Sequence, residues 1–250
     1  TAVPAFADVY DIRKGSITIV ANGDGTAKVT QNETVNDKDD DVKVTGSNEV
    51  TGNTVDIINN TDNDLKVTLS DVTITDPKGD AAPVSVSGTG NTAIELDGSN
   101  TLKSSGWHAG LERNEEKNSD GNVVSGKLTI QDDNDNAGSL TATGGYFGAG
   151  IGGGSAKAGQ VTITGGTITA ISGDGAGIGG GQGNMGSNAG NADIEISGGT
   201  IEATGGYTSA GIGGGYYGDA TIKITGDAVI KNATGGTFGA GIGGGGGGEG

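Results

Sequence analysis

The sequence Ala-Gly-Ile-Gly-Gly-Gly at 149–154 recurs along the chain and decides the fold. Further copies begin at Ala176, Ala210 and Ala240, so successive copies start 27, 34 and 30 residues apart. A degenerate copy, Ala109-Gly110-Leu111, lies upstream. Recurrence at about thirty residues indicates a repeat architecture, in which each repeat is one supersecondary unit that buries its apolar face only by stacking on its neighbours.

Two short runs with alternating apolar residues precede each copy. The first run contains the pairs Val67/Leu69, Ile94/Leu96, Leu128/Ile130, Val161/Ile163, Ile194/Ile196 and Ile222/Ile224. The second contains Val72/Ile74, Leu102, Leu140/Ala142, Ile168/Ala170, Ile201/Ala203 and Val229. Alternation with a period of two is typical of a β-strand that points one side chain inward and the next outward. Each repeat therefore predicts three short strands, the third being the Ala-Gly-Ile run.

Stacked three-stranded repeats predict an all-β protein, a right-handed parallel β-helix of about six to seven coils. Right-handedness follows from the strong preference of parallel crossover connections. Glycine pairs such as Gly165-Gly166 and Gly198-Gly199 supply the positive φ angles that the corners between strands need. A narrow interior filled by columns of Ile, Val, Leu and Ala explains why an apolar content of 32% is sufficient.

Composition and charge exclude several classes of partner. The chain has 54 glycines, 3 prolines, no cysteine and a net charge of −17. Nucleic acids and anionic membranes are bound through Lys and Arg, so neither is expected as a partner. No stretch approaches the roughly 20 apolar residues of a spanning helix, and no membrane insertion is expected.

The ends of the chain suggest processing and a longer parent protein. Residues 1–7 end in Ala5-Phe6-Ala7, the small-x-small pattern of a signal-peptidase site, and are interpreted as the remnant of a signal peptide. Residues 8–60 are predicted to form an N-terminal cap and the first coil. Residues 61–250 are predicted to form the Gly-rich coils, truncated at the C-terminus and followed by further domains. This organisation predicts a secreted or cell-surface protein.

The glycine spacing does not indicate a nucleotide site. Gly148-x-Gly150-x-x-Gly153 matches the dinucleotide-binding pattern, and two later segments match it as well. A true dinucleotide loop joins one strand to one helix and occurs once, whereas here the pattern recurs within strand-only repeats. We interpret these glycines as packing positions.

Candidates for catalysis are few. The chain has a single histidine, His108, and two arginines, Arg13 and Arg113. His108, Glu112 and Arg113 fall close enough in sequence to meet at one corner, which would offer acid–base groups. The alternative interpretation is a surface turn that carries these polar side chains without a catalytic role, and no catalytic residue is predicted.

Two acidic runs are candidate calcium sites, because Asp and Asn oxygens in a loop are the hard ligands that Ca²⁺ prefers. The first consists of Asp132, Asp133, Asn134 and Asp135, and the second of Asp37, Asp39 and Asp41. Neither follows the spacing of an EF-hand, and solvated acidic turns remain the alternative interpretation.

Aromatic residues recur at one position of the repeat. They lie two or three residues before the alanine of the third strand, on glycine-flanked corners: Trp107, Tyr146, Phe147, Tyr207 and Phe238. In one repeat Asp174 takes this place. Exposed rings in a row along an extended solenoid are suited to stacking on the sugar units of a polymer. Rings that merely shield the corner are the alternative.

The signal-like start, the Gly-Ala-Gly-Ile-Gly-Gly-Gly coils and the run Ala-Ile-Glu-Leu-Asp-Gly-Ser-Asn-Thr-Leu at 93–102 resemble secreted bacterial carbohydrate-binding β-helix proteins with a polysaccharide-lyase-like topology. The resemblance covers about residues 10–245. It implies a non-catalytic protein that binds a polysaccharide, with Ca²⁺ in some turns, and no site residue can be transferred individually. A structural or adhesive cell-surface repeat protein is the second hypothesis, and a polysaccharide lyase is the third.

Overall fold

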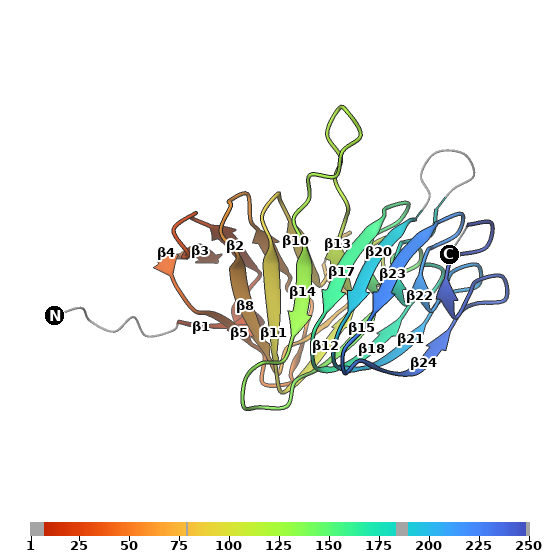
Figure 1. Ribbon diagram of the computed structural model, residues 1–250. Helices are drawn as coiled ribbons and strands as arrows, with labels where there is room; N and C mark the ends of the chain where they lie inside the picture. Colours follow the sequence, from red (N-terminus) through yellow and green to blue (C-terminus); the bar gives the residue numbers. More distant parts are fainter. Residues whose placement is uncertain (1–7, 79, 184–189, 249–250) are drawn as a thin grey trace.

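The computed structural model describes residues 8–78, 80–183 and 190–248 and shows β-strands wound about one axis (Figure 1). One turn of the chain, here called a rung, contributes one short strand to each of three parallel sheets. About eight rungs stack from the N-terminal to the C-terminal end. The predicted right-handed parallel β-helix with three strands per coil is therefore confirmed.

The strands alternate among the sheets in chain order. Sheet 1 contains β1 (Val9–Asp11), β5 (Val42–Thr45), β8 (Leu65–Ser70), β11 (Thr92–Asp97), β14 (Leu128–Gln131), β17 (Gly159–Ile163), β20 (Ala192–Ile196) and β23 (Ala220–Ile224). Sheet 2 contains β6 (Val50–Thr51), β9 (Thr73–Thr75), β12 (Ser99–Lys103), β15 (Ser139–Thr143), β18 (Thr167–Ile171), β21 (Thr200–Thr204) and β24 (Val229–Thr234). Sheet 3 contains β2 (Ile17–Ala21), β7 (Val55–Ile58), β10 (Val84–Ser87), β13 (Leu111–Arg113), β16 (Ile151–Gly152), β19 (Ile178–Gly179), β22 (Ile212–Gly213) and β25 (Ile242–Gly243).

The stack has about eight rungs where six or seven were expected, because residues 8–60 contain two rungs. The first rung consists of β1 and β2, with the short 3₁₀ helix η1 (Ile12–Lys14) in the place of a sheet 2 strand. Since that rung lacks one of the three alternating runs, its sequence does not show the repeat. The strands β3 (Ala27–Gln31) and β4 (Thr34–Asp39) then extend sheet 3 in antiparallel fashion from β2 (Figure 1).

Columns of identical or similar side chains fill the interior. Ile94, Ile130, Ile163 and Ile196 are aligned partners in successive strands of sheet 1, and each is fully buried. Burial of one such side chain contributes about 1.5–3 kcal/mol relative to exposure. The column ends in the last rung, where Ile224 is 37% exposed. The alternation in the sequence therefore identified the inward positions correctly.

Glycines occupy a matching column in sheet 3. Gly152, Gly179, Gly213 and Gly243 are register partners and have φ angles between +129° and +138°. A Cβ atom added to any of the first three would collide with the carbonyl oxygen of the next glycine in the column. The recurring glycines thus allow backbone to pack directly on backbone, as the packing interpretation of the motif predicts.

Two of the expectations for the chain ends fall outside the described residues. The interpreted signal-peptide remnant at 1–7 lies there, as do the last two residues of the Gly-rich C-terminal segment. Within the part of the chain that the structure describes, no helix is long and apolar enough to cross a membrane.

Candidate functional site

The predicted aromatic residues lie on the loops that lead from sheet 2 to sheet 3, and we call this edge of the solenoid the aromatic corner. In rung 5 the corner contains Gly144, Gly145, Tyr146 and Phe147. A Cβ on Gly145 would collide with the carbonyl oxygen of Gly106 in rung 4, so the loop backbones stack closely here. Tyr146, which follows the glycines, extends away from the stack and is 70% exposed, whereas Phe147 is half-buried.

The rings form two clusters and not one continuous row. In the first cluster, Phe147 contacts Trp107 with ring centroids 5.0 Å apart and Tyr146 with centroids 5.6 Å apart. In the second, Tyr207 and Phe238 lie 5.3 Å apart. All three contacts are edge-to-face, with interplanar angles of 61°, 73° and 87°. Each cluster is thus partly self-packed, yet Trp107, Tyr146, Tyr207 and Phe238 each remain more than half exposed.

A hollow of about 500 Å³ adjoins the second cluster. Tyr207 and Phe238 line one part of it, and Tyr216 and Tyr217 from the loop after β22 line another. The latter two rings lie 4.1 Å apart, and the Tyr216 hydroxyl donates to that of Tyr217 at 3.1 Å. This concave, largely aromatic wall offers both apolar ring faces and hydroxyl groups to a ligand.

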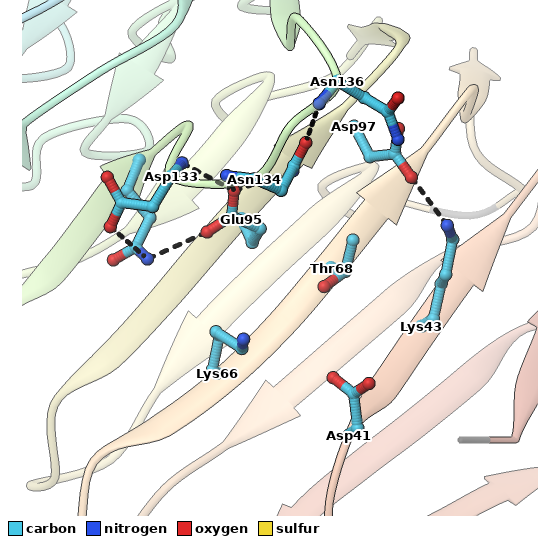
Figure 2. Close-up of a pocket in the computed structure, with 10 residues that line it drawn as sticks. Asp41, Lys43, Lys66, Thr68, Glu95, Asp97, Asp133, Asn134 and Asn136 are labelled. Carbon is cyan, nitrogen blue, oxygen red and sulfur yellow. Dashed lines mark hydrogen bonds and ion pairs between the residues drawn. The ribbon is translucent and has the colours of Figure 1, made fainter. Parts of the chain in front are cut away.

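The first predicted calcium run is organised around a buried glutamate that sequence reasoning missed. The backbone N–H groups of Asp133 and Asn134 donate to Glu95 Oε1 at 2.8 and 3.2 Å, and Asn134 Nδ2 donates to the same oxygen at 2.8 Å (Figure 2). Gln131 Nε2 donates to Glu95 Oε2 at 2.9 Å and to Asp133 Oδ2 at 3.0 Å. Glu95 lies in β11, one rung below the turn, and is 4% exposed. The turn is therefore held by a protein carboxylate.

The remaining acids of that run do not converge on a common point. Asp135 is exposed, and Asp132 Oδ1 is buried without a hydrogen-bond partner among the described residues. Across the described ranges, no group of three or more His, Cys, Asp and Glu side chains is arranged to hold a metal ion. Calcium at Asp132, Asp133, Asn134 and Asp135 thus remains a prediction from residue type.

The acids of the second predicted calcium run, Asp37, Asp39 and Asp41, do not share a common site. Asp39 accepts hydrogen bonds from the Tyr10 hydroxyl at 2.7 Å and from the Asp41 backbone N–H at 3.0 Å. Burial, assisted by Asp39, raises the pKa of Tyr10. Asp37 forms a surface ion pair with Lys28 at 3.1 Å. Asp37 and Asp39 therefore have different partners, because the register of β3 and β4 shifts between Asn36 and Asp39 and interrupts the regular alternation of the strand.

A polar groove of about 520 Å³ runs over the outer face of sheet 1, beside the turn at 132–136 (Figure 2). Lys43 Nζ lies 2.6 Å from Asp97 Oδ2, and this hydrogen-bonded ion pair holds the pKa of Asp97 below its usual range. The side chains of Asp41 and Lys66, also in the groove, have no hydrogen-bond or ion-pair partner among the described residues. Since Glu95 accepts four internal hydrogen bonds and Asp97 is ion-paired, these carboxylates mainly order the groove.

Of the three residues considered for catalysis, His108 and Glu112 meet and Arg113 does not join them. His108 Nδ1 lies 2.8 Å from Glu112 Oε2, and its Nε2 lies 3.7 Å from Asp80 Oδ1. Arg113 points to the opposite side of its strand and is fully buried. Histidine, glutamate and arginine, which their spacing allowed to meet, therefore do not converge, because the neighbouring positions Glu112 and Arg113 of β13 face different sides.

The His108–Glu112 pair predicts a pH dependence of stability. The hydrogen bond to Glu112 raises the pKa of His108, with a further contribution from Asp80. A raised folded-state pKa stabilises the protein below the unfolded value of about 6.5, and this contribution is lost as the pH rises through the folded pKa. We expect the difference in unfolding free energy between the native protein and His108→Gln to shrink as the pH rises from 6 to 9. Urea titrations at several pH values measure it, and a constant difference would contradict the assignment.

Comparison with known proteins identifies the repeat but no individual relative. Three segments, residues 136–155, 161–182 and 194–216, match a family model described as a beta helix repeat. They correspond to parts of rungs 5, 6 and 7, each including one loop of the aromatic corner. No curated protein and no solved structure matches the chain.

Proposed function

We propose that this chain, a right-handed parallel β-helix that contains beta helix repeats, is an extracellular non-catalytic protein that binds a polysaccharide along its aromatic corner. The observation that carries the proposal is the exposure of four large rings, between 55% and 70%, along one edge of the solenoid. Large aromatic side chains exposed together mark interaction sites more often than chance, and their flat faces suit the apolar faces of sugar rings.

The spacing of the two clusters supports an extended ligand. The rings extend from Trp107 in rung 4 to Phe238 in rung 8, and four rung spacings correspond to about 19 Å along the solenoid axis. A single sugar unit is too short to contact all of them. A polymer of repeated units can contact both clusters, and it gains affinity from the second cluster without a further loss of free translation.

Aromatic substitutions at the two clusters test this proposal. The double variants Trp107→Ala/Phe147→Ala and Tyr207→Ala/Phe238→Ala are each expected to lower the affinity for a retained polysaccharide at least about tenfold, because truncation of a central aromatic anchor commonly has that effect. Affinity electrophoresis in gels containing neutral or acidic polysaccharides measures the loss. Val50→Ala, at a position that is 69% exposed in β6, is the matched control.

The same experiment separates the competing hypotheses. Circular dichroism of each variant shows whether the β-sheet content is preserved. If both double variants migrate as the native protein does, the aromatic corner is not the binding surface. If the native protein is retained by no polysaccharide, the function itself is wrong, and the adhesive or structural hypothesis takes its place.

In this proposal Ca²⁺ has only a structural role, as an ion that orders the turn at 132–136. That turn joins sheet 1 to sheet 2, whereas the aromatic corner joins sheet 2 to sheet 3. We therefore expect chelation to leave polysaccharide retention unchanged. Retention that requires added Ca²⁺ would move the binding surface to the polar groove of Figure 2.

A further inference from the structure

The loop of rung 6 at the aromatic corner is one residue shorter than its neighbours. Thr143, Ile171 and Thr204 are register partners at the ends of their sheet 2 strands, and Ile151, Ile178 and Ile212 are partners in sheet 3. The alanine that opens the third run is reached through residues 144–148 in rung 5 and 205–209 in rung 7. In rung 6 it is reached through 172–175 only.

The shortened loop borders a hollow beside the first aromatic cluster. It carries Gly173 and Asp174 where the neighbouring rungs carry Tyr146-Phe147 and Tyr207-Thr208. The hollow has a volume of about 410 Å³ and is lined by Tyr146 and Asp174, by Ser104 and Ser105 of rung 4, and by the glycines of the rung 5 and rung 6 loops. The interruption of the aromatic row is thus a concave site with its own chemistry.

Two polar groups in the hollow lack partners within the described part of the chain. The Asp174 carboxylate accepts no hydrogen bond and forms no ion pair there, although its backbone carbonyl accepts one from Ser209 Oγ. The Ser104 hydroxyl also lacks a partner, but its oxygen is buried beneath the surface of the hollow. Of these two groups, only the half-buried Asp174 carboxylate is open to a ligand.

Apolar and polar groups face this hollow together. Tyr146 presents an exposed ring on one side, and the Asp174 carboxylate can accept hydrogen bonds from two adjacent hydroxyl groups. The glycines keep the space open, and the residues that line it include no Lys or Arg. A carboxylate without a cation, in a chain of net charge −17, repels uronic and sulfated sugars.

We infer that the hollow binds one neutral pyranose unit, with its face on the Tyr146 ring and two of its hydroxyls on the Asp174 carboxylate. This inference rests on the proposed polysaccharide function and adds the class of sugar and the residues that select it. The remaining rings of the first cluster and those of the second then contact neighbouring units of the same chain.

Two variants test the inference: one removes the charge of Asp174, and the other fills the hollow with a side chain. Binding of neutral gluco-, manno-, galacto- and xylo-oligosaccharides, and of galacturonate oligosaccharides, is measured by titration calorimetry. We expect the native protein to bind at least one neutral series and not the galacturonates. Asp174→Asn keeps the size of the side chain and is expected to weaken binding roughly ten- to hundredfold, since hydrogen bonds to a charged acceptor are the stronger ones. Asp227→Asn, on an exposed turn of rung 8, is the matched control.

A second variant fills the hollow without touching the carboxylate. A Cβ on Gly173 would lie 3.3 Å from the Gly145 carbonyl oxygen and 3.4 Å from that of Tyr146, so a side chain there enters the hollow. Gly173→Val is expected to abolish binding of the neutral oligosaccharide while the unfolding midpoint changes little. Normal binding by Asp174→Asn, or galacturonate binding that equals neutral binding, would overturn the inference. If Asp174→Asn binds normally while the aromatic double variants do not, the proposed function stands and only the site assignment fails.

Discussion

Gly179→Ala is expected to lower the free energy of unfolding by more than about 4 kcal/mol, and a failure to fold is within that range. Gly179 has a φ of +133°, which a residue with a Cβ rarely adopts. The added methyl group would also collide with the Gly213 carbonyl oxygen and lie 3.0 Å from the Ala192 Cβ. That carbonyl belongs to the paired strand β22, so it cannot move without breaking the stacking of rungs 6 and 7.

Gly25→Ala is the control that separates backbone strain from close packing. Gly25 also has a positive φ, +86°, but an added Cβ would have no neighbour within 4 Å. We expect this control to lose only about 1 kcal/mol, the ordinary effect of placing alanine in a glycine conformation. Urea unfolding followed by circular dichroism compares the two. Equal losses for the two variants would mean that contact between backbones does not fix the rung spacing.

Arg113→Met is expected to lower the free energy of unfolding by about 3–5 kcal/mol. The guanidinium group is fully buried and donates to three carbonyl oxygens. Nε and Nη2 donate to Gly126 at 3.0 and 2.5 Å, Nη1 to Val86 at 3.2 Å, and Nη2 also to Gly88 at 2.7 Å. Burial lowers the pKa of this arginine. Methionine fills much of the space but offers no donor, so these carbonyl groups lose the hydrogen bonds that offset their burial.

The control for Arg113 is the exposed Arg13. Arg13 pairs with Asp11 at 2.7 Å and with Glu49 at 3.0 Å on the surface, and Arg13→Met is expected to change stability by less than about 1 kcal/mol. Arg113→Lys is informative as well, because one ammonium group cannot reproduce the planar fork of donors. If Arg113→Met unfolds at the same urea concentration as the native protein, the carbonyl cluster does not depend on the guanidinium group.

The strands and their inward faces could be predicted because each repeat shows them as a local alternation of apolar and polar residues. Ile94, Ile130 and Ile163 alternate with polar neighbours in each copy, and the structure stacks them as partners. The first rung could not be found in this way. Its sheet 2 strand is replaced by η1, so the apolar residues Tyr10 and Ile12 are not followed by a second alternating run.

The candidate sites were predictable only in part. The exposure of Trp107, Tyr146 and Phe238 followed from their glycine-flanked loops. The hydrogen bonds between Glu95 and the turn at 132–136 could not be predicted. Glu95 precedes its partners Asp133 and Asn134 by 38 and 39 positions in the sequence. The acids at Asp37, Asp39 and Asp41 looked like a cluster, but a register shift in β4 gives Asp37 and Asp39 different partners.

The sequence alone determines the period, the three strands per rung and the identity of the core columns, because these depend on the alternation of neighbours along the chain. The tertiary structure decides which side chains of different rungs meet, since rung spacing and register bring together residues about thirty positions apart. It buries Arg113 among carbonyl groups, splits the aromatic row into two clusters and opens the hollow at Asp174. A loop shortened by one residue is inconspicuous in the sequence, yet between two longer loops it leaves a space that a ligand can fill.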